Sequence, residues 1–316
     1  MTQQIPTAPR AGVMAWLRLM RLPTVFTALA NVLCGFFVSS SERNPAVIIT
    51  QPWFWLLLLA SAGLYLGGMV LNDVFDAALD AKERPERPIP SGAISKANAA
   101  IFGTLLMGGG VAAAWFAGQS AQSGFASVNI AIILAATVLL YDSILKNTII
   151  APLGMGACRF LNILLGASCS GSLSTVFSNP QLAIATALAV YVIGVTWFAR
   201  HEAGNSSQNG LRTGLAIAVA GIGINIWTAA RAPTSAGQGA IIALALIAAN
   251  VSFRSLRAIK LNQPRFLQKN VGFMLLNIIF MDAAMTFAMT GSSRLATIVV
   301  ILVIPATLMK RFIPLS

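Results

Sequence analysis

The acidic side chains of this chain are unevenly distributed, and five of the nine lie between positions 73 and 86. Three of them, Asp73, Asp76 and Asp80, follow Asn72 at spacings of three and four residues. At a helical advance of about 100° per residue, all four side chains fall within roughly 100° of one another around the axis. Like charges on one helical face repel one another. The pattern therefore needs a compensating cation.

An oxygen-only cluster of this kind suits a hard divalent cation. Mg²⁺ typically takes one or two carboxylates and completes its octahedron with water and phosphate oxygens. A single histidine and three well-separated cysteines offer no set of nitrogen or sulfur ligands. We therefore predict that Asp73, Asp76 and Asp80 hold Mg²⁺, with Asn72 beside them. The alternative is a solvated helix end, but carboxylates at a helix C-terminus oppose the macrodipole.

The following segment, residues 81–92, carries three basic side chains and three prolines. Proline at this density cannot continue a helix, so we expect a stiff loop over the same end of the span. Its basic residues follow the acids without interleaving on their face. The guanidinium of Arg87 could donate two parallel hydrogen bonds to phosphate oxygens. Alternatively, the basic residues of the loop could act only in orienting the protein during membrane insertion. Glu83 and Glu86 are predicted to balance Arg84 and Arg87.

The elements that position these residues are membrane helices. Apolar residues make up 57% of the 316 residues and charged residues only 9%, whereas a soluble domain carries about a quarter charged residues. Apolar runs of roughly 18 or more residues predict transmembrane helices. They occupy residues 22–39, 53–76, 97–117, 126–141, 152–170, 181–199, 211–230, 238–258, 271–290 and 294–309.

The predicted fold is all-α, a single polytopic membrane domain over residues 1–316. The last two runs form a tight pair around Gly291, so nine or ten spans are both compatible with the sequence. The loops are short and leave no room for a soluble domain. The first 15 residues lack the apolar stretch of a cleavable signal, and the first span is expected to remain in the membrane.

The net charge of +12 has a topological explanation. With a cytoplasmic N-terminus and alternating spans, the external loops contain only Arg43, Arg231 and Arg294 among the basic residues. This bias is the positive-inside pattern that orients helices, and it favours anionic lipid headgroups over nucleic acid as the partner. The acidic cluster then lies on the cytoplasmic side, and we expect a bacterial inner-membrane protein.

At this point the sequence resembles a known family. The pattern Asn72-Asp-x-x-Asp-x-x-x-Asp80, followed by RPxRPIPSG at residues 84–92, resembles the first aspartate motif of the UbiA superfamily of membrane prenyltransferases. Residues 21–31, 141–146 and 155–166 resemble further family elements, so that the likeness covers essentially the whole chain.

The resemblance implies nine helices around a central cavity, where Mg²⁺ on aspartates binds an isoprenoid diphosphate. It further implies ionisation of the allylic C–O bond and attack on the carbocation by an electron-rich acceptor, inside a bundle that excludes water. The residues that it assigns to catalysis are Asp73, Asp76, Tyr141 and Lys146. Those that it assigns to substrate binding are Asn72, Arg87, Lys146, Arg159 and Asn162, and those that it assigns to metal are Asp73, Asp76 and Asp80.

The sequence departs from the family at a second aspartate-rich motif, expected at the end of the sixth span. Glu202 is the acid there, after Arg200 and His201, and Asp142 is the other candidate acid on this side. In one account Arg200 and Glu202 complete the substrate site, with Arg200 gripping phosphate. In the other, catalysis is lost. We favour activity, because the costly acids of the first motif would otherwise lack a physical reason. The Arg-x-Glu-Ala variant resembles a UbiA-like branch found in ebo-type gene clusters.

The sequence therefore predicts an enzyme that transfers a prenyl group from a polyprenyl diphosphate to a hydrophobic, cyclic acceptor in the bilayer, with Mg²⁺ as cofactor. The alternatives are a non-catalytic isoprenoid-binding protein and a transporter. A transporter is expected to have internal repeats and broken helices near the midplane, whereas these acids lie at one membrane face. Asp282, in the middle of the ninth span, is a further candidate because intramembrane acids are usually functional.

Overall fold

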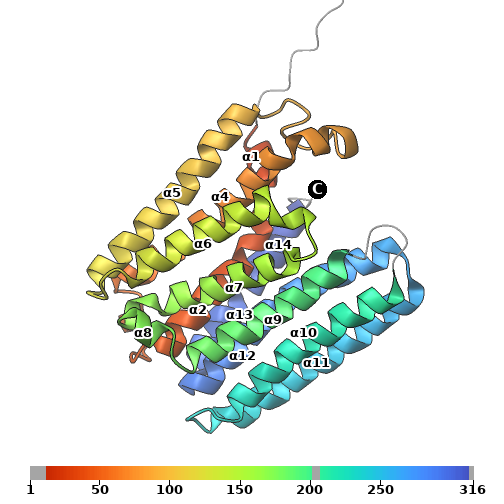
Figure 1. The fold of residues 1–316 in the computed structure, drawn as a ribbon. Coiled ribbons are helices and arrows are strands. Elements are labelled where there is room, and N and C mark those ends of the chain that lie inside the picture. The colour runs from red at the N-terminus through yellow and green to blue at the C-terminus, as the bar shows by residue number, and fades with distance from the viewer. Residues whose placement is uncertain (1–11, 201–206, 313–316) are drawn as a thin grey trace, which may run out of the picture.

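The computed structural model describes residues 12–200 and 207–312, which form helices with no strand among them. The long helices lie alongside one another in one bundle (Figure 1). They are α2 (Val25–Ser39), α4 (Pro52–Glu83), α5 (Lys96–Ser120), α6 (Ala126–Ser143), α7 (Ala151–Ala167), α9 (Gln181–Arg200), α10 (Gln208–Ala229), α11 (Ala236–Leu261) and α12 (Pro264–Thr290). The shorter elements are α1 (Val13–Leu19), η1 (Leu22–Thr24), α3 (Pro45–Ile48), η2 (Leu145–Asn147), η3 (Ser168–Ser170), α8 (Leu173–Val176), α13 (Ser293–Ile301) and α14 (Val303–Phe312).

Helices that follow one another in sequence are also neighbours in space. Helix α4 packs on α5 and α6, α7 on α6 and α9, α10 on α9 and α11, and α12 on α11. Helix α2 joins the two halves of the bundle by packing against α4, α7 and α12. It carries the most completely buried of the long apolar stretches. The site described below lies where α2, α4, α6 and α7 meet.

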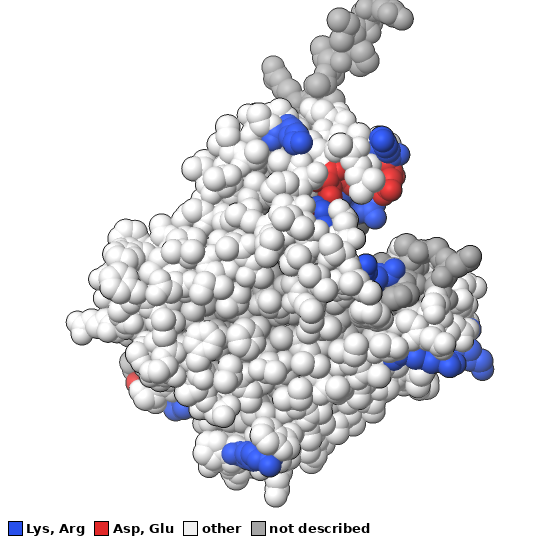
Figure 2. All heavy atoms as spheres, viewed as in Figure 1, with Lys and Arg blue, Asp and Glu red and all other residues white. Residues whose placement is uncertain are grey.

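Ten helical segments within the described residues are long and apolar enough to cross a membrane. The tenth is made of α13 and α14, which are separated at Leu302. On the face drawn in Figure 2, charged side chains gather at the ends of the helices, and a broad uncharged surface lies between them. The protein is therefore an integral, multi-pass membrane protein. The sequence was compatible with nine or ten spans, and ten segments within the described residues have the length and hydropathy of a span.

Two predicted boundaries differ from the structure because hydropathy detects the bilayer and not the helix. Helix α4 continues through Glu83, seven residues past the predicted end of its span, and α12 begins at Pro264. In both extensions the helix continues beyond the apolar segment into residues that are more polar. Helix α4 ends at Glu83, directly before Arg84 and Pro85. A proline disfavours helical geometry in the residue that precedes it, which here is Arg84. The carboxylates are thus held on a rigid helix.

Glycines permit the closest helix crossing. A Cβ on Gly35 of α2 would overlap the carbonyl oxygen of Ile163 of α7, and a Cβ on Gly166 would overlap that of Val32. Small residues at membrane-helix interfaces allow backbones to approach in this way. The crossing brings α2 and α7 together immediately beside the polar residues described below.

Replacing Gly35 with alanine will destabilise the protein by about 1–3 kcal/mol, because the added methyl meets backbone that cannot move aside locally. The measurement is the thermal unfolding midpoint in detergent. Gly108 of α5 is the matched control, since a Cβ there meets nothing within 4 Å. Gly108→Ala should leave the midpoint unchanged or raise it slightly. Equal midpoints for the two variants would contradict the close crossing.

Candidate active site

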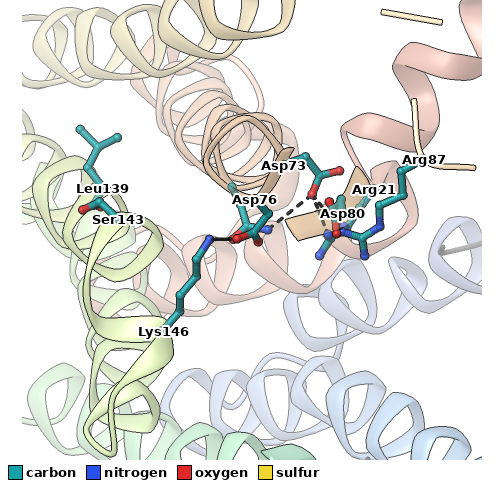
Figure 3. Close-up of polar contacts among 9 residues, drawn as sticks. Arg21, Asp73, Asp76, Asp80, Arg87, Leu139, Ser143 and Lys146 are labelled. Atoms are coloured by element: carbon teal, nitrogen blue, oxygen red, sulfur yellow. Dashed lines mark hydrogen bonds and ion pairs between the residues drawn. The ribbon is translucent and has the colours of Figure 1, made fainter. Parts of the chain in front are cut away.

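The C-terminal part of α4 presents Asp73, Asp76 and Asp80 in an environment that is largely screened from water. Asp73 is 5% exposed and Asp80 is 4% exposed, whereas the Asp76 side chain is 22% exposed. Figure 3 shows the three carboxylates close together around this helix. The three acidic side chains therefore lie at the same end of α4, and their predicted role as metal ligands stays a prediction.

Basic side chains compensate these acids, contrary to the expectation from their order in the sequence. Arg87 turns back from the loop after α4, with Nη1 2.8 Å from Asp80 Oδ2 and 3.8 Å from Asp73 Oδ1. The prediction that Glu83 and Glu86 balance Arg87 was wrong. The loop closes in a turn through a hydrogen bond from Arg87 N to Arg84 O. This turn carries the Arg87 side chain inward, where it is 4% exposed.

A second arginine reaches the cluster from the beginning of the chain. Arg21 immediately precedes η1 and has a left-handed backbone conformation with φ 47°. Its Nη2 lies 2.8 Å from Asp73 Oδ1 (Figure 3). The sequence resemblance included the stretch from Arg21 but gave this residue no role. The sequence feature that could have identified Arg21 is its place directly before a helix start that contains proline. This helix start lies on the same side of the membrane as the C-terminal end of α4.

Lys146 neutralises the third carboxylate. It lies in η2, after α6, and its Nζ is 2.5 Å from Asp76 Oδ1 and 3.3 Å from Asn72 Oδ1. The structure therefore brings together Asn72, Asp76 and Lys146, three residues that the sequence assigned to one site. Figure 3 shows Lys146 approaching α4 from one side, whereas Arg21 and Arg87 approach from the other.

The donor set is compatible with a divalent metal, although the ion pairs occupy part of it. Within residues 12–200 and 207–312, no group of three His, Cys, Asp or Glu side chains is arranged as a metal site. Each α4 aspartate nevertheless uses only one oxygen in its ion pair. The other oxygens, Asp73 Oδ2, Asp76 Oδ2 and Asp80 Oδ1, make no hydrogen bond or ion pair with the described residues.

Below this polar end lies an apolar cavity between α4, α6 and α7. Its lining residues are Ser61, Leu64, Tyr65, Gly68, Met69, Leu134, Val138, Tyr141, Asp142, Met155, Cys158, Arg159 and Asn162. The predicted residues Tyr141, Arg159 and Asn162 are all in this wall. The cavity therefore lies inside the bundle, beside the part of α4 that precedes its carboxylates.

Arg159 and Asn162 line the cavity and already make hydrogen bonds to other residues of the protein. Arg159 donates to Asn31 Oδ1 and to Thr27 Oγ1, both at 3.0 Å, and its guanidinium lies 5.3 Å from the centre of the Tyr65 ring. Asn162 donates to Ala28 O at 2.8 Å and accepts from Ser61 at 2.9 Å. Their predicted substrate role stays a prediction.

The structure supplies the partner of the intramembrane acid. Asp282 of α12 is 2% exposed, and its Oδ2 accepts a hydrogen bond of 2.6 Å from Asn31 Nδ2. Because Asn31 also accepts from Arg159, one amide bridges a buried carboxylate and a buried guanidinium. Hydrogen bonds in such a network satisfy polar groups that would be costly in an apolar interior.

The region of the missing second motif is only partly described. Arg200, at the exposed end of α9, donates to the carbonyl oxygens of Thr148 at 2.7 Å and Ile149 at 3.1 Å. It thereby fastens α9 to the loop that follows η2. Glu202, the other predicted substrate residue in this region, lies outside the described residues.

The fold and the site together define a class of protein: a multi-pass membrane bundle in which one helix carries a carboxylate and cation cluster at its end and lines an apolar cavity with its preceding residues. The family model described as "UbiA prenyltransferase family" matches residues 28–278. The chain belongs to this family, as the motifs predicted. The comparisons do not bear on the ebo-type branch, which stays a prediction.

Curated relatives carry the name digeranylgeranylglyceryl phosphate synthase. The protein of Metallosphaera sedula is 32% identical over 134 residues, covering 42% of this chain and 43% of its own length. That of Methanoculleus marisnigri is 30% identical over 180 residues, covering 56% of this chain and 59% of its own length. The chain thus spans about half the length of the curated relatives that it matches.

Solved structures share the fold over nearly their whole length. A UbiA homolog from Archaeoglobus fulgidus has a TM-score of 0.62 and 13% identity, covering 90% of this chain and 99% of its own. The same homolog bound to GPP and Mg²⁺ has a TM-score of 0.58 and 13% identity, covering 83% and 99%. At these identities the likeness concerns the fold.

Proposed function

We propose that the protein transfers a prenyl group from an isoprenoid diphosphate to a hydrophobic acceptor within the membrane. The observation that carries the proposal is that α4 bears the carboxylate and cation cluster at its C-terminal end and lines an apolar cavity with the residues that precede this cluster. A prenyl diphosphate likewise has a polyanionic head, which would match the charged cluster, and an apolar tail, which would match the cavity. Family membership and the names of the relatives support the same reaction class.

The basic side chains of the cluster are suited to the leaving group. In this proposal Arg21, Arg87 and Lys146 exchange part of their contacts with the α4 aspartates for diphosphate oxygens. Arginine is well adapted to this exchange because its planar fork can bind two phosphate oxygens. Fixed charges that are aimed at the place where negative charge develops lower the barrier to departure.

The free carboxylate oxygens of Asp73, Asp76 and Asp80 would hold Mg²⁺, with Asn72 beside them. When bound, the ion would neutralise charge on the departing diphosphate. Oxygen ligands are those that Mg²⁺ prefers, and each aspartate keeps one oxygen outside its ion pair. The solved homolog bound to GPP and Mg²⁺ supports this choice of ion.

The cavity wall would hold the tail and the acceptor. Its apolar side chains exclude water from a carbocation, and Tyr65 and Tyr141 supply two aromatic rings. We propose a hydrophobic, cyclic acceptor that packs against these rings. A glyceryl phosphate lipid is the second candidate, because the relatives' name contains that product. We further propose that the cluster and the N-terminus face the cytoplasm, because the external loops carry so few basic residues.

Purified protein supplied with Mg²⁺ and geranyl, farnesyl or geranylgeranyl diphosphate will release diphosphate when a suitable acceptor is present. Acceptors to compare are a phenol with an alkyl tail and a geranylgeranylated glyceryl phosphate. The measurements are diphosphate release and the mass of the lipid product, each with and without EDTA. An isoprenoid-binding protein or transporter would instead be stabilised thermally by the donors and release no diphosphate with any acceptor.

A further inference from the structure

The site contains a fourth carboxylate that forms no ion pair with a basic side chain of the described residues. Asp142 lies near the end of α6, directly after Tyr141, and is 4% exposed. Its Oδ2 is buried and makes no hydrogen bond with any described residue. Each of the three α4 aspartates accepts from Arg21, Arg87 or Lys146. Each of the three cations therefore already pairs with a carboxylate other than that of Asp142.

Asp142 is surrounded by apolar side chains and by charged groups of both signs. Its carboxylate interacts electrostatically with Asp76 and Asp73, and with Lys146 and Arg21 among the cations. Lys146, however, places its Nζ 2.5 Å from Asp76 Oδ1, and Arg21 places its guanidinium against Asp73. A buried carboxylate without a partner is costly. A cation bound beside it would remove this cost, as would a proton on the carboxylate.

The position of Asp142 indicates what that ligand is. Asp142 lines the cavity and also lies within electrostatic range of Asp76, so it stands at the junction between the cavity and the cluster. The nearby acids offer oxygen ligands only. Cys158 also lines the cavity, but thiolates select softer metals than Mg²⁺. A hard divalent cation fits this set.

We propose that Asp142 of α6 is a metal-binding residue, which holds Mg²⁺ together with the free oxygen of Asp76 on the neighbouring helix α4. This inference rests on the proposed function in that the cation is the one that accompanies the diphosphate. Asp142 would then hold the ion on the cavity side, whereas Asp73 and Asp80 lie toward Arg21 and Arg87. The metal site would span two helices.

The test is the binding of Mn²⁺, which takes the same oxygen ligands as Mg²⁺ and can be followed by electron paramagnetic resonance. Full-length protein in detergent is titrated with Mn²⁺ alone and with geranyl diphosphate. Asp142→Asn should weaken Mn²⁺ binding by about tenfold or more, and Asp142→Glu should restore part of it. Glu42→Gln is the matched control, because it removes a carboxylate from the loop at the opposite end of α2 and should bind as wild type.

Thermal unfolding without metal separates binding from folding. Asp142→Asn should be at least as stable as wild type, because an amide carries no charge that burial would penalise. Equal Mn²⁺ affinity of wild type and Asp142→Asn would overturn the proposal, as would a wild type that binds no Mn²⁺ under either condition. If Asp142→Asn loses Mn²⁺ while wild type makes no lipid product, the metal site stands and the proposed function falls. If wild type makes product and both proteins bind Mn²⁺ equally, the proposed function stands and the metal-binding role of Asp142 falls.

Discussion

Asp76→Asn will lower the rate of diphosphate release by about 10²–10³-fold, the range found when one group that stabilises transition-state charge is removed. Asp76 is the most exposed of the α4 aspartates, with 22% of its side chain accessible, and it lies beside Lys146 and Asn72. The amide keeps the size of the side chain but loses its charge. The rate is measured with geranyl diphosphate, Mg²⁺ and an acceptor that the wild-type protein uses.

Lys146→Met tests whether this pair acts as a unit. If Lys146 and Asp76 both serve the same diphosphate, the double variant should be less impaired than the product of the two single effects, since coupled residues are not additive. Glu42→Gln should release diphosphate at the wild-type rate. A rate for Asp76→Asn that equals that of wild type would remove the catalytic role of the α4 carboxylates.

Arg159→Met will lower the free energy of unfolding by about 3–5 kcal/mol, as expected when one member of a buried charged network is removed. The change leaves Asn31 Oδ1 and Thr27 Oγ1 without their donor. It also removes the nearest cation of this network from Asp282, to which Asn31 donates at 2.6 Å. The measurement is unfolding in mixed detergent micelles.

Two companion variants identify the cause of the loss. Arg159→Lys keeps the charge but lacks the planar fork that reaches two acceptors, so it should recover only part of the stability. Adding Asp282→Asn to Arg159→Met should cost less than the two separate losses combined, because the carboxylate is then no longer left uncompensated. Wild-type stability of Arg159→Met would show that the network does not hold α2 against α7 and α12.

Local patterns in the sequence were sufficient to predict the helices and the acidic end of α4. The apolar runs have the length of a bilayer, and the spacing of Asp73, Asp76 and Asp80 repeats with the helix, so both features follow from short stretches of chain. The continuation of α4 to Glu83 was missed because polar turns outside the bilayer do not register in hydropathy. Lys146 was found only because a motif marked it.

The cations of the site were harder to predict, since their placement depends on the assembled bundle. Arg21 is 52 residues from Asp73 in the sequence, and no periodicity relates them. Arg87 is only seven residues from Asp80, yet the proline-containing turn decides whether it points toward the helix or away. Asp142 likewise has no basic partner among the described residues because the neighbouring cations pair with other carboxylates.

The three ion pairs have a consequence for selectivity. Arg21, Arg87 and Lys146 come from three separate segments, and each is already matched to a carboxylate on one helix. An incoming anion must therefore replace existing partners rather than fill a positive pocket. A singly charged anion can open one pair and leave the others closed, so it gains little. A ligand with several negative oxygens that arrives with its own metal can exchange all three partners at once. In the proposed function, the cluster would thus discriminate by the number of charges that a ligand brings.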